Sequence, residues 1–266
     1  ILRKSKYLQS NIGFAYRRVK QYLIQNINVL FTGTPCQIAG LKAYLGKEYP
    51  NLLTMEVICH GVPSYLFFRS YKSDMEKKYH SCLRAIDFRS KENCGWKDSR
   101  IHLTFENSKY YQNYALALDD CFMKGFLKFY CLRPSCHTCP YASLPRYADF
   151  TVGDCWGIEY FKPDEENKHG MSLMLCNTPK AKELIPRLRQ FAILTPVNLS
   201  TAIKFNQQLC VPTPENPART AFMRDLKTLP FTEVKKRYLR PRPLLNRLAT
   251  RFLGDSLKLY IKRLIG

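Results

Sequence analysis

The sequence predicts an α/β (α+β) fold, with a mixed sheet, flanking helices, an antiparallel insert and a basic helical tail at the C-terminus. A short apolar strand that runs into a loop and then a helix occurs twice, with the strands at 28–31 and 52–58. Strands that alternate with helices are typical of α/β units. Three further strands without helices between them, at 83–88, 100–105 and 110–114, indicate the antiparallel insert.

The helices follow from apolar residues that recur at helical spacing. The first is expected after an N-cap at Ser10 or Asn11 and continues to Leu23. Four later helices and two further strands are also predicted. The helices are expected at about 36–45, 65–78, 119–129 and 179–191, and the strands at 150–152 and 173–176.

Length and composition place the chain among ordinary globular proteins. It has 266 residues, which suits one large domain or two small ones, and 45% of them are hydrophobic. We expect a main domain over 1–215 and a basic helical extension over 216–266. The chain begins at Ile1 without Met, in what reads as the middle of a fold, so we expect further residues upstream. No apolar run approaches the ~18 residues that span a bilayer, and no signal peptide is visible.

The net charge of +21 indicates an anionic partner without choosing one. Residues 219–266 carry thirteen Lys and Arg against three Asp and Glu, and apolar residues recur among them at steps of three to five. This basic amphipathic tail suits packing on the domain or contact with an anionic membrane surface, and both readings stay open. We expect a cytoplasmic protein, with peripheral contact at the inner membrane surface under the second reading.

Eleven cysteines in a chain of this size favour a reducing compartment with free or metal-bound thiols. Cys36 and Cys59 each follow a predicted strand, and strand ends of an open α/β sheet share one edge. Cys136 and Cys139 form a C-x-x-C with Pro140 behind it. Four such thiolates suit a 4Fe-4S cluster or a structural zinc, and single ligands far apart in sequence favour the cluster modestly. A thioredoxin-like dithiol fits less well, because such a motif should open a helix after an early strand.

Several motifs together resemble the coenzyme F-420 hydrogenase/dehydrogenase beta-subunit family, C-terminal domain. The main ones are Gly33-Thr34-Pro35-Cys36-Gln37, Ile58-Cys59-His60-Gly61-Val62-Pro63, Gly95-Trp96, Arg133 to Cys139 and Ala148 to Gly157, with Lys6-Tyr7 and Lys168 to Ser172 similar too. The resemblance covers about residues 1–215 and is nearest to bacterial members found among polysaccharide-biosynthesis genes. It implies FAD beside a 4Fe-4S cluster, and electrons passed between a ferredoxin-type donor, or an upstream ferredoxin-like domain, and a hydride-type acceptor.

The resemblance also implies a site. The cluster ligands would be Cys36, Cys59, Cys136 and Cys139, with Cys131 or Cys155 as the first replacements. The flavin would lie by Lys6, Tyr7, Thr32, Gly33, Thr34, Gly153, Asp154, Gly170 and Ser172. His60 is a candidate proton relay and Lys91 a candidate substrate-binding cation, although a loop-capping His and a solvated Lys are the plainer readings.

Two classes of function therefore stay open. The first is a flavin- and 4Fe-4S-dependent oxidoreductase acting on a small-molecule substrate, with no nucleic acid among its partners. The second is a non-redox, metal- or cluster-stabilised binding protein of a glycan-assembly complex. The visible spectrum of anaerobically purified protein separates them.

Overall fold

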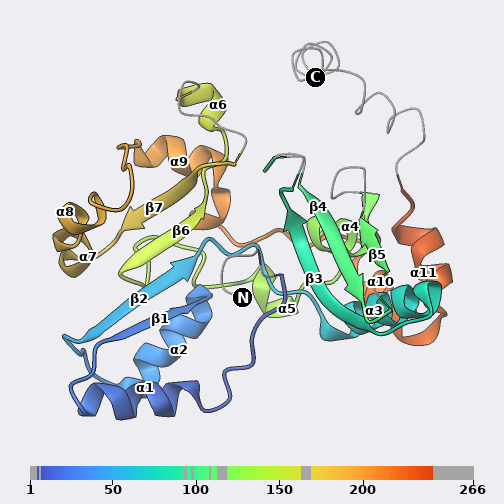
Figure 1. The fold of residues 1–266 in the computed structure, drawn as a ribbon, viewed down its shortest axis with the longest axis horizontal. Coiled ribbons are helices and arrows are strands. Elements are labelled where there is room, and N and C mark those ends of the chain that lie inside the picture. The colour runs from blue at the N-terminus through green and yellow to red at the C-terminus, as the bar shows by residue number, and fades with distance from the viewer. Residues whose placement is uncertain are drawn as a thin grey trace. The chain divides into compact units, whose positions relative to one another are not determined.

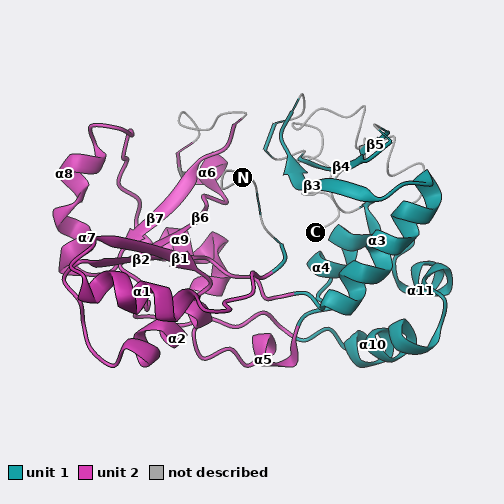
Figure 2. Ribbon diagram, turned by 60° about the horizontal axis from the view of Figure 1, so that its bottom comes forward, with its two compact units in different colours: residues 1–8, 63–132, 215–266 teal, residues 9–62, 133–214 magenta. Residues whose placement is uncertain are grey.

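The computed structural model describes residues 5, 7–92, 95–96, 99–107, 109–112, 119–162 and 169–241. These residues form two compact units, each discontinuous in sequence (Figure 2). Unit 1 comprises residues 1–8, 63–132 and 215–266, and unit 2 comprises residues 9–62 and 133–214. The boundary expected near residue 215 coincides with the start of the last segment of unit 1, and the division into 1–215 and 216–266 as functional parts stays a prediction.

Unit 2 is built on a four-stranded sheet in the order β1-β2-β6-β7 (Figure 1). The strands β1, β2 and β6 are parallel and β7 is antiparallel to β6, so the expected mixed sheet is confirmed. The four strands are β1 (Val29–Gly33), β2 (Leu52–Val57), β6 (Phe150–Asp154) and β7 (Ser172–Cys176).

The sequence predicts three helices of unit 2, and two of these three differ from the expectation. The first helix begins at Ala15, not directly after Asn11, because Asn11 Oδ1 accepts from Gly13 N at 3.0 Å and closes a turn before it. The helix expected over 179–191 is split, and Pro186 lies in the first turn of its second piece. The helices are α1 (Ala15–Ile24), α2 (Pro35–Leu45), α5 (Pro134–His137), α6 (Ile158–Phe161), α7 (Pro179–Glu183), α8 (Ile185–Leu188), α9 (Leu199–Phe205) and the 3-10 turn η3 (Gln207–Leu209).

Unit 1 contains the antiparallel insert, in the strand order β3-β4-β5, which confirms the predicted meander. Its strands and helices are β3 (Leu83–Ser90), β4 (Arg100–Phe105), β5 (Tyr110–Gln112), α3 (Tyr65–Tyr79), α4 (Cys121–Leu127), α10 (Arg219–Thr228) and α11 (Phe231–Tyr238). Phe67 of α3 stacks on Phe122 of α4 and meets Phe222 of α10 edge-on, each at 5.4 Å between ring centroids. The described part of the basic tail therefore packs into the core of unit 1.

Some predicted features lie outside the described residues. They include Lys6, Lys168 and the tail beyond Pro241, so the predicted contact of that tail with a membrane surface stays a prediction, as does a cytoplasmic location. Among the helices that the structure describes, none combines the length and apolarity needed to cross a bilayer.

A buried carboxyl fixes the start of α4. Asp120 is the N-cap, and its Oδ1 accepts from Phe122 N at 2.8 Å and Met123 N at 3.0 Å. Tyr71 donates its hydroxyl to Asp120 Oδ2 at 2.9 Å. Burial raises the pKa of Asp120 from 3.8 to about 6, and these hydrogen bonds offset part of the rise.

We predict that this carboxyl makes the stability of unit 1 depend on pH. Because the folded pKa is raised, the stability from Asp120 is present below about pH 4 and is lost as the pH rises through about 6. Asp120→Asn cannot ionise and keeps an oxygen for the cap, so its urea midpoint should fall less between about pH 4 and about pH 7. Fluorescence of the buried Trp96 in a Trp156→Phe background follows unit 1. An equal fall in both proteins would contradict the prediction.

Candidate functional site

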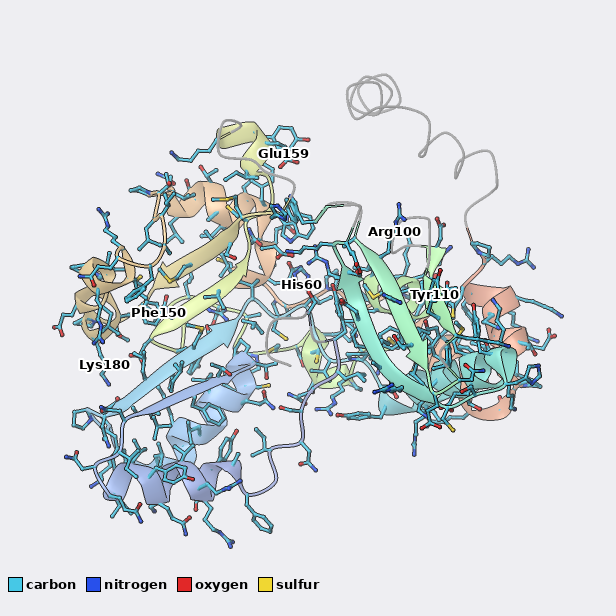
Figure 3. The ribbon with its side chains drawn as sticks, viewed as in Figure 1. His60, Arg100, Tyr110, Phe150, Glu159 and Lys180 are labelled. Carbon is cyan, nitrogen blue, oxygen red and sulfur yellow. The ribbon has the colours of Figure 1, made fainter. Side chains whose placement is uncertain are left out.

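Two of the four candidate thiols lie at the same edge of the sheet of unit 2. Cys36 is in the first turn of α2, directly after β1, and Cys59 follows the end of β2. The parallel register pairs Gly33 with Glu56, so β1 and β2 end side by side. Figure 3 shows His60 beyond this end of β2, with Lys180 near its opposite end. The expectation that the two strand-end loops are neighbours therefore follows from the sheet itself.

Backbone hydrogen bonds bring the C-x-x-C to the loop after β2. Arg133 N donates to Val62 O at 3.0 Å, and Val62 N donates to Cys136 Sγ at 3.4 Å. Pro134 then starts the short helix α5, which carries Cys136, and Cys139 follows two residues after its end. Two segments more than seventy residues apart in sequence thus share one loop cluster.

The four thiols lie close enough to act on one another electrostatically. Burial raises the pKa of Cys59 to about 11, and the neighbouring Cys136, Cys36 and Cys139 raise it further. Burial also raises the pKa of Cys136, again with contributions from Cys139 and Cys36. Of the two replacement candidates, Cys155 is buried in unit 2, whereas Cys131 belongs to the core of unit 1.

Among the described residues, no group of three or more His, Cys, Asp or Glu side chains is arranged to hold a single metal ion. A mononuclear zinc site needs all four sulfurs within ~2.3 Å of one ion, whereas a cluster spreads its ligands over several irons. The choice between a cluster and a zinc site at these thiols therefore stays a prediction.

Backbone N–H groups donate to two of the four sulfurs. Gly61 N donates to Cys59 Sγ at 3.4 Å, in addition to the bond from Val62 N to Cys136. Thr34 Oγ1 lies 3.1 Å from Cys36 Sγ. Donors aimed at a sulfur stabilise its negative charge, and they also shift the reduction potential of a bound cluster.

Gln9 adds a second polar contact on Cys36 that the sequence does not reveal. Its Nε2 lies 3.3 Å from Thr34 Oγ1 and 3.8 Å from Cys36 Sγ. Arg133 Nη1 donates to Gln9 Oε1 at 2.6 Å. The Gln9 amide thus connects the Arg133 guanidinium to the Cys36 thiol at the start of α2.

Thr213 holds two of the loops at the site. Its Oγ1 donates to His60 O at 2.9 Å, and its carbonyl oxygen lies 3.0 Å from His137 Nδ1. Because that carbonyl can only accept, Nδ1 of His137 carries the proton, while its Nε2 is buried without a hydrogen-bond partner among the described residues. His137 separates the two cysteines of the C-x-x-C, so this contact fixes the motif.

The candidate flavin residues divide between the two faces of the sheet. By register and alternation, Thr32, Asp154 and Ser172 lie on one face, and Gly33 and Gly153 on the other. The first face also carries Leu30, 56% exposed, and Val57, 44% exposed. Parallel sheets are usually covered on both faces, so this open face can accept a flat apolar group with polar residues at its rim.

The glycines on the covered face do not leave empty space for a cofactor. A Cβ on Gly153 would lie 2.7 Å from Ile58 Cδ1, and one on Gly33 would lie 3.0 Å from Gln37 Oε1. Both positions are filled by side chains next to the cysteine loops. Thr34 lies in the same loop, where its N–H donates to Gln37 Oε1 at 3.0 Å.

The other candidates are placed as follows. Tyr7 and Lys91 belong to unit 1, where Tyr7 packs edge-on against Phe126 at 4.8 Å between ring centroids. Gly170, with φ of 82°, forms the turn before β7. Lys6 lies outside the described residues. The roles of all these residues stay predictions.

A buried ion pair supports the whole site from the covered face of the sheet. Arg146 Nε donates to Glu56 Oε1 at 2.6 Å, with side-chain exposures of 1% and 0%. Thr151 Oγ1 donates to the same oxygen at 2.9 Å. Arg146 Nη1 donates to Tyr141 O at 3.0 Å, just past the C-x-x-C, and to Leu209 O at 3.3 Å. The pair therefore joins β2, β6, the C-x-x-C loop and η3.

These features define an α/β protein with a thiol-rich site suited to electron-transfer chemistry. The chain belongs to the family of the C terminus of the coenzyme F420 hydrogenase/dehydrogenase beta subunit, whose model matches residues 27–200. No curated protein matches it. The resemblance read from the motifs is confirmed, and it indicates a redox-related subunit of the hydrogenase and dehydrogenase type. The link to polysaccharide biosynthesis stays a prediction.

We predict that Arg146→Leu destabilises unit 2 by about 3–5 kcal/mol, because it leaves Glu56 buried and unpaired. The double variant Arg146→Leu, Glu56→Met removes both charges and should recover most of that loss. Urea unfolding followed by Trp156 fluorescence in a Trp96→Phe background measures both. A double variant no more stable than the single one would contradict the prediction.

We also predict that Gly153→Ala disturbs the cysteine loop after β2, because its Cβ would displace Ile58, the residue before Cys59. Iron retention should fall in this variant as much as flavin retention. Loss of flavin with full retention of iron would show that Gly153 acts on the flavin alone.

Proposed function

We propose that the chain is a flavin- and 4Fe-4S-dependent oxidoreductase subunit, with Cys36, Cys59, Cys136 and Cys139 as cluster ligands. The observation that carries the proposal is the loop cluster itself. Cys36 and Cys59 follow the adjacent ends of β1 and β2, and Val62 N, from the loop that carries Cys59, donates to Cys136 Sγ at 3.4 Å. Membership of a hydrogenase and dehydrogenase subunit family supports redox chemistry at such a site.

The cluster would supply one-electron transfer and FAD the exchange between single electrons and a hydride. The protein's own part is to hold the four sulfurs and to neutralise their charge. Gly61 N and Val62 N donate to two of the sulfurs, and Gln9 carries the influence of Arg133 to Cys36. These donors stabilise added negative charge and therefore favour the reduced form.

For the flavin, we propose the open face of the sheet of unit 2. Thr32, Asp154 and Ser172 would give polar contacts at its rim, and Met55 and Val152 an apolar floor. A ring system on this face would lie at the strand ends that carry Cys36 and Cys59. The electrons would pass between a ferredoxin-type donor and a hydride-type acceptor or small substrate, and His60, half-buried in the loop after β2, is the proposed proton relay.

The test is the visible spectrum of anaerobically purified protein, with iron and flavin quantified. We predict about four irons and one flavin per chain, with the iron lost in Cys59→Ser and Cys136→Ser. Cys82→Ser is the control, because this exposed thiol of unit 1 should be dispensable.

Three other results would each change the proposal. Protein without iron and flavin would favour the non-redox binding protein. Stoichiometric zinc in place of iron would show that these cysteines hold a zinc ion and not a cluster. If Cys82→Ser loses as much iron as Cys59→Ser and Cys136→Ser do, the assignment of Cys59 and Cys136 as cluster ligands is wrong.

A further inference from the structure

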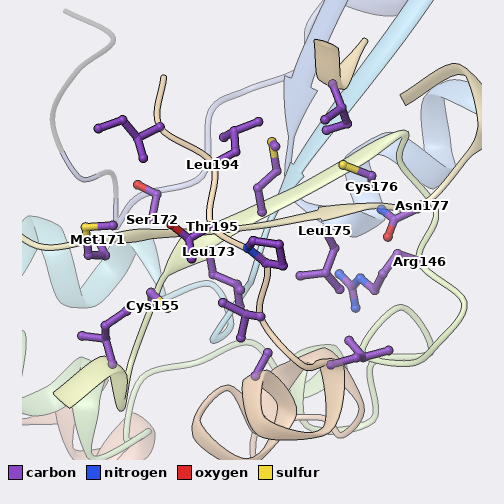
Figure 4. A pocket seen from close by; sticks show the side chains of 18 of the residues that line it. Arg146, Cys155, Met171, Ser172, Leu173, Leu175, Cys176, Asn177, Leu194 and Thr195 are labelled. Carbon is purple, nitrogen blue, oxygen red and sulfur yellow. The ribbon is translucent and has the colours of Figure 1, made fainter. Parts of the chain in front are cut away.

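Unit 2 contains a cavity of about 840 Å³ beside β7. None of the four thiols proposed to bind the cluster lines it, whereas Ser172, proposed above at the rim of the flavin face, does. Its size is that of pockets that bind drug-sized ligands. Figure 4 shows Leu194 and Thr195, from the segment that follows α8, beside the side chains of β7. Ile158 of α6 and Ala202 of α9 also line the cavity. All residues that line the cavity belong to the same unit.

The lining is mostly apolar. The apolar lining includes Met174 and Leu175 of β7, Leu194 and Val197 of the segment after α8, and Ile185 of α8. A ligand that fills this space would bury mainly hydrocarbon. At ~25 cal/mol per Å² of apolar surface, burial of that kind is the main source of binding free energy.

The charged groups of the lining are all cationic. Arg146 and Arg189 line the cavity, and no Asp or Glu does. The charge of Arg146 is balanced by Glu56, although its Nη2 is buried without a hydrogen-bond partner among the described residues. Arg189 is exposed and forms no ion pair with the described part of the chain. The cavity therefore presents one net positive charge.

We propose that this pocket binds an apolar molecule that carries a single carboxylate. The hydrocarbon part would occupy the cavity between β7 and the segment of residues 193–197, and the carboxylate would pair with Arg189. A guanidinium matches a carboxylate because its planar fork donates two parallel hydrogen bonds. The inference does not rest on the proposed function, because the binding needs neither cluster nor flavin.

The test is calorimetric titration of the purified chain with decanoate and with decylammonium, which share a chain length and differ in the sign of the charge. We expect decanoate to bind at least about tenfold more tightly. Arg189→Gln should weaken decanoate binding about tenfold and leave decylammonium binding unchanged or improved. Arg187 is an exposed cation of α8, two residues before Arg189, and does not line the cavity. Arg187→Gln should therefore leave decanoate binding unchanged.

A second variant tests the cavity rather than the charge. Thr195→Trp places a large ring in the lining and should abolish binding of both probes, provided that its thermal midpoint stays near that of the parent. The proposal is overturned if Arg187→Gln weakens decanoate binding as much as Arg189→Gln does, or if folded Thr195→Trp binds normally. It is also overturned if decanoate displaces bound flavin, because the pocket would then belong to the cofactor.

Discussion

The structure of the candidate site depends on one buried ion pair, Glu56 with Arg146. A carboxylate inside an apolar strand needs a cation close by, and Arg146 reaches it from the loop behind the C-x-x-C. The same guanidinium donates to Tyr141 O, so the charge that Glu56 requires also determines where the second pair of cysteines lies. The strand that ends in Cys59 and the loop after Cys139 are thereby held by a contact on the covered face of the sheet.

The order of elements at this edge was predictable from the sequence where a local rule applied. Two strands that each run into a cysteine-bearing loop place Cys36 and Cys59 together, since parallel neighbours end at one edge. The meander was predictable because its three strands have no helix between them. The apolar run around Glu56 also indicates the buried ion pair, because a carboxylate within a buried strand needs a cation or hydrogen-bond donors close by.

The contacts between distant segments could not be read in this way. Gln9 reaches Cys36 across 27 residues, and no periodicity links the two. The position of a residue on the open or the covered face depends on strand register, which separated Thr32 and Asp154 from Gly33 and Gly153. A glycine beside a motif suggests space for a cofactor, yet Ile58 already occupies the space beside Gly153.

The discontinuity of both units has a consequence for biosynthesis. Unit 2 is completed only by residues 133–214, and contacts such as that of Thr54 with Asp149 span 95 residues. On the ribosome, the segment with Cys36 and Cys59 emerges well before the segment with Cys136 and Cys139. Contacts of such long sequence separation form late. Cys36 and Cys59 are therefore synthesised before unit 2 can fold. The four thiols can come together only after residues 63–132 of unit 1 have also been synthesised.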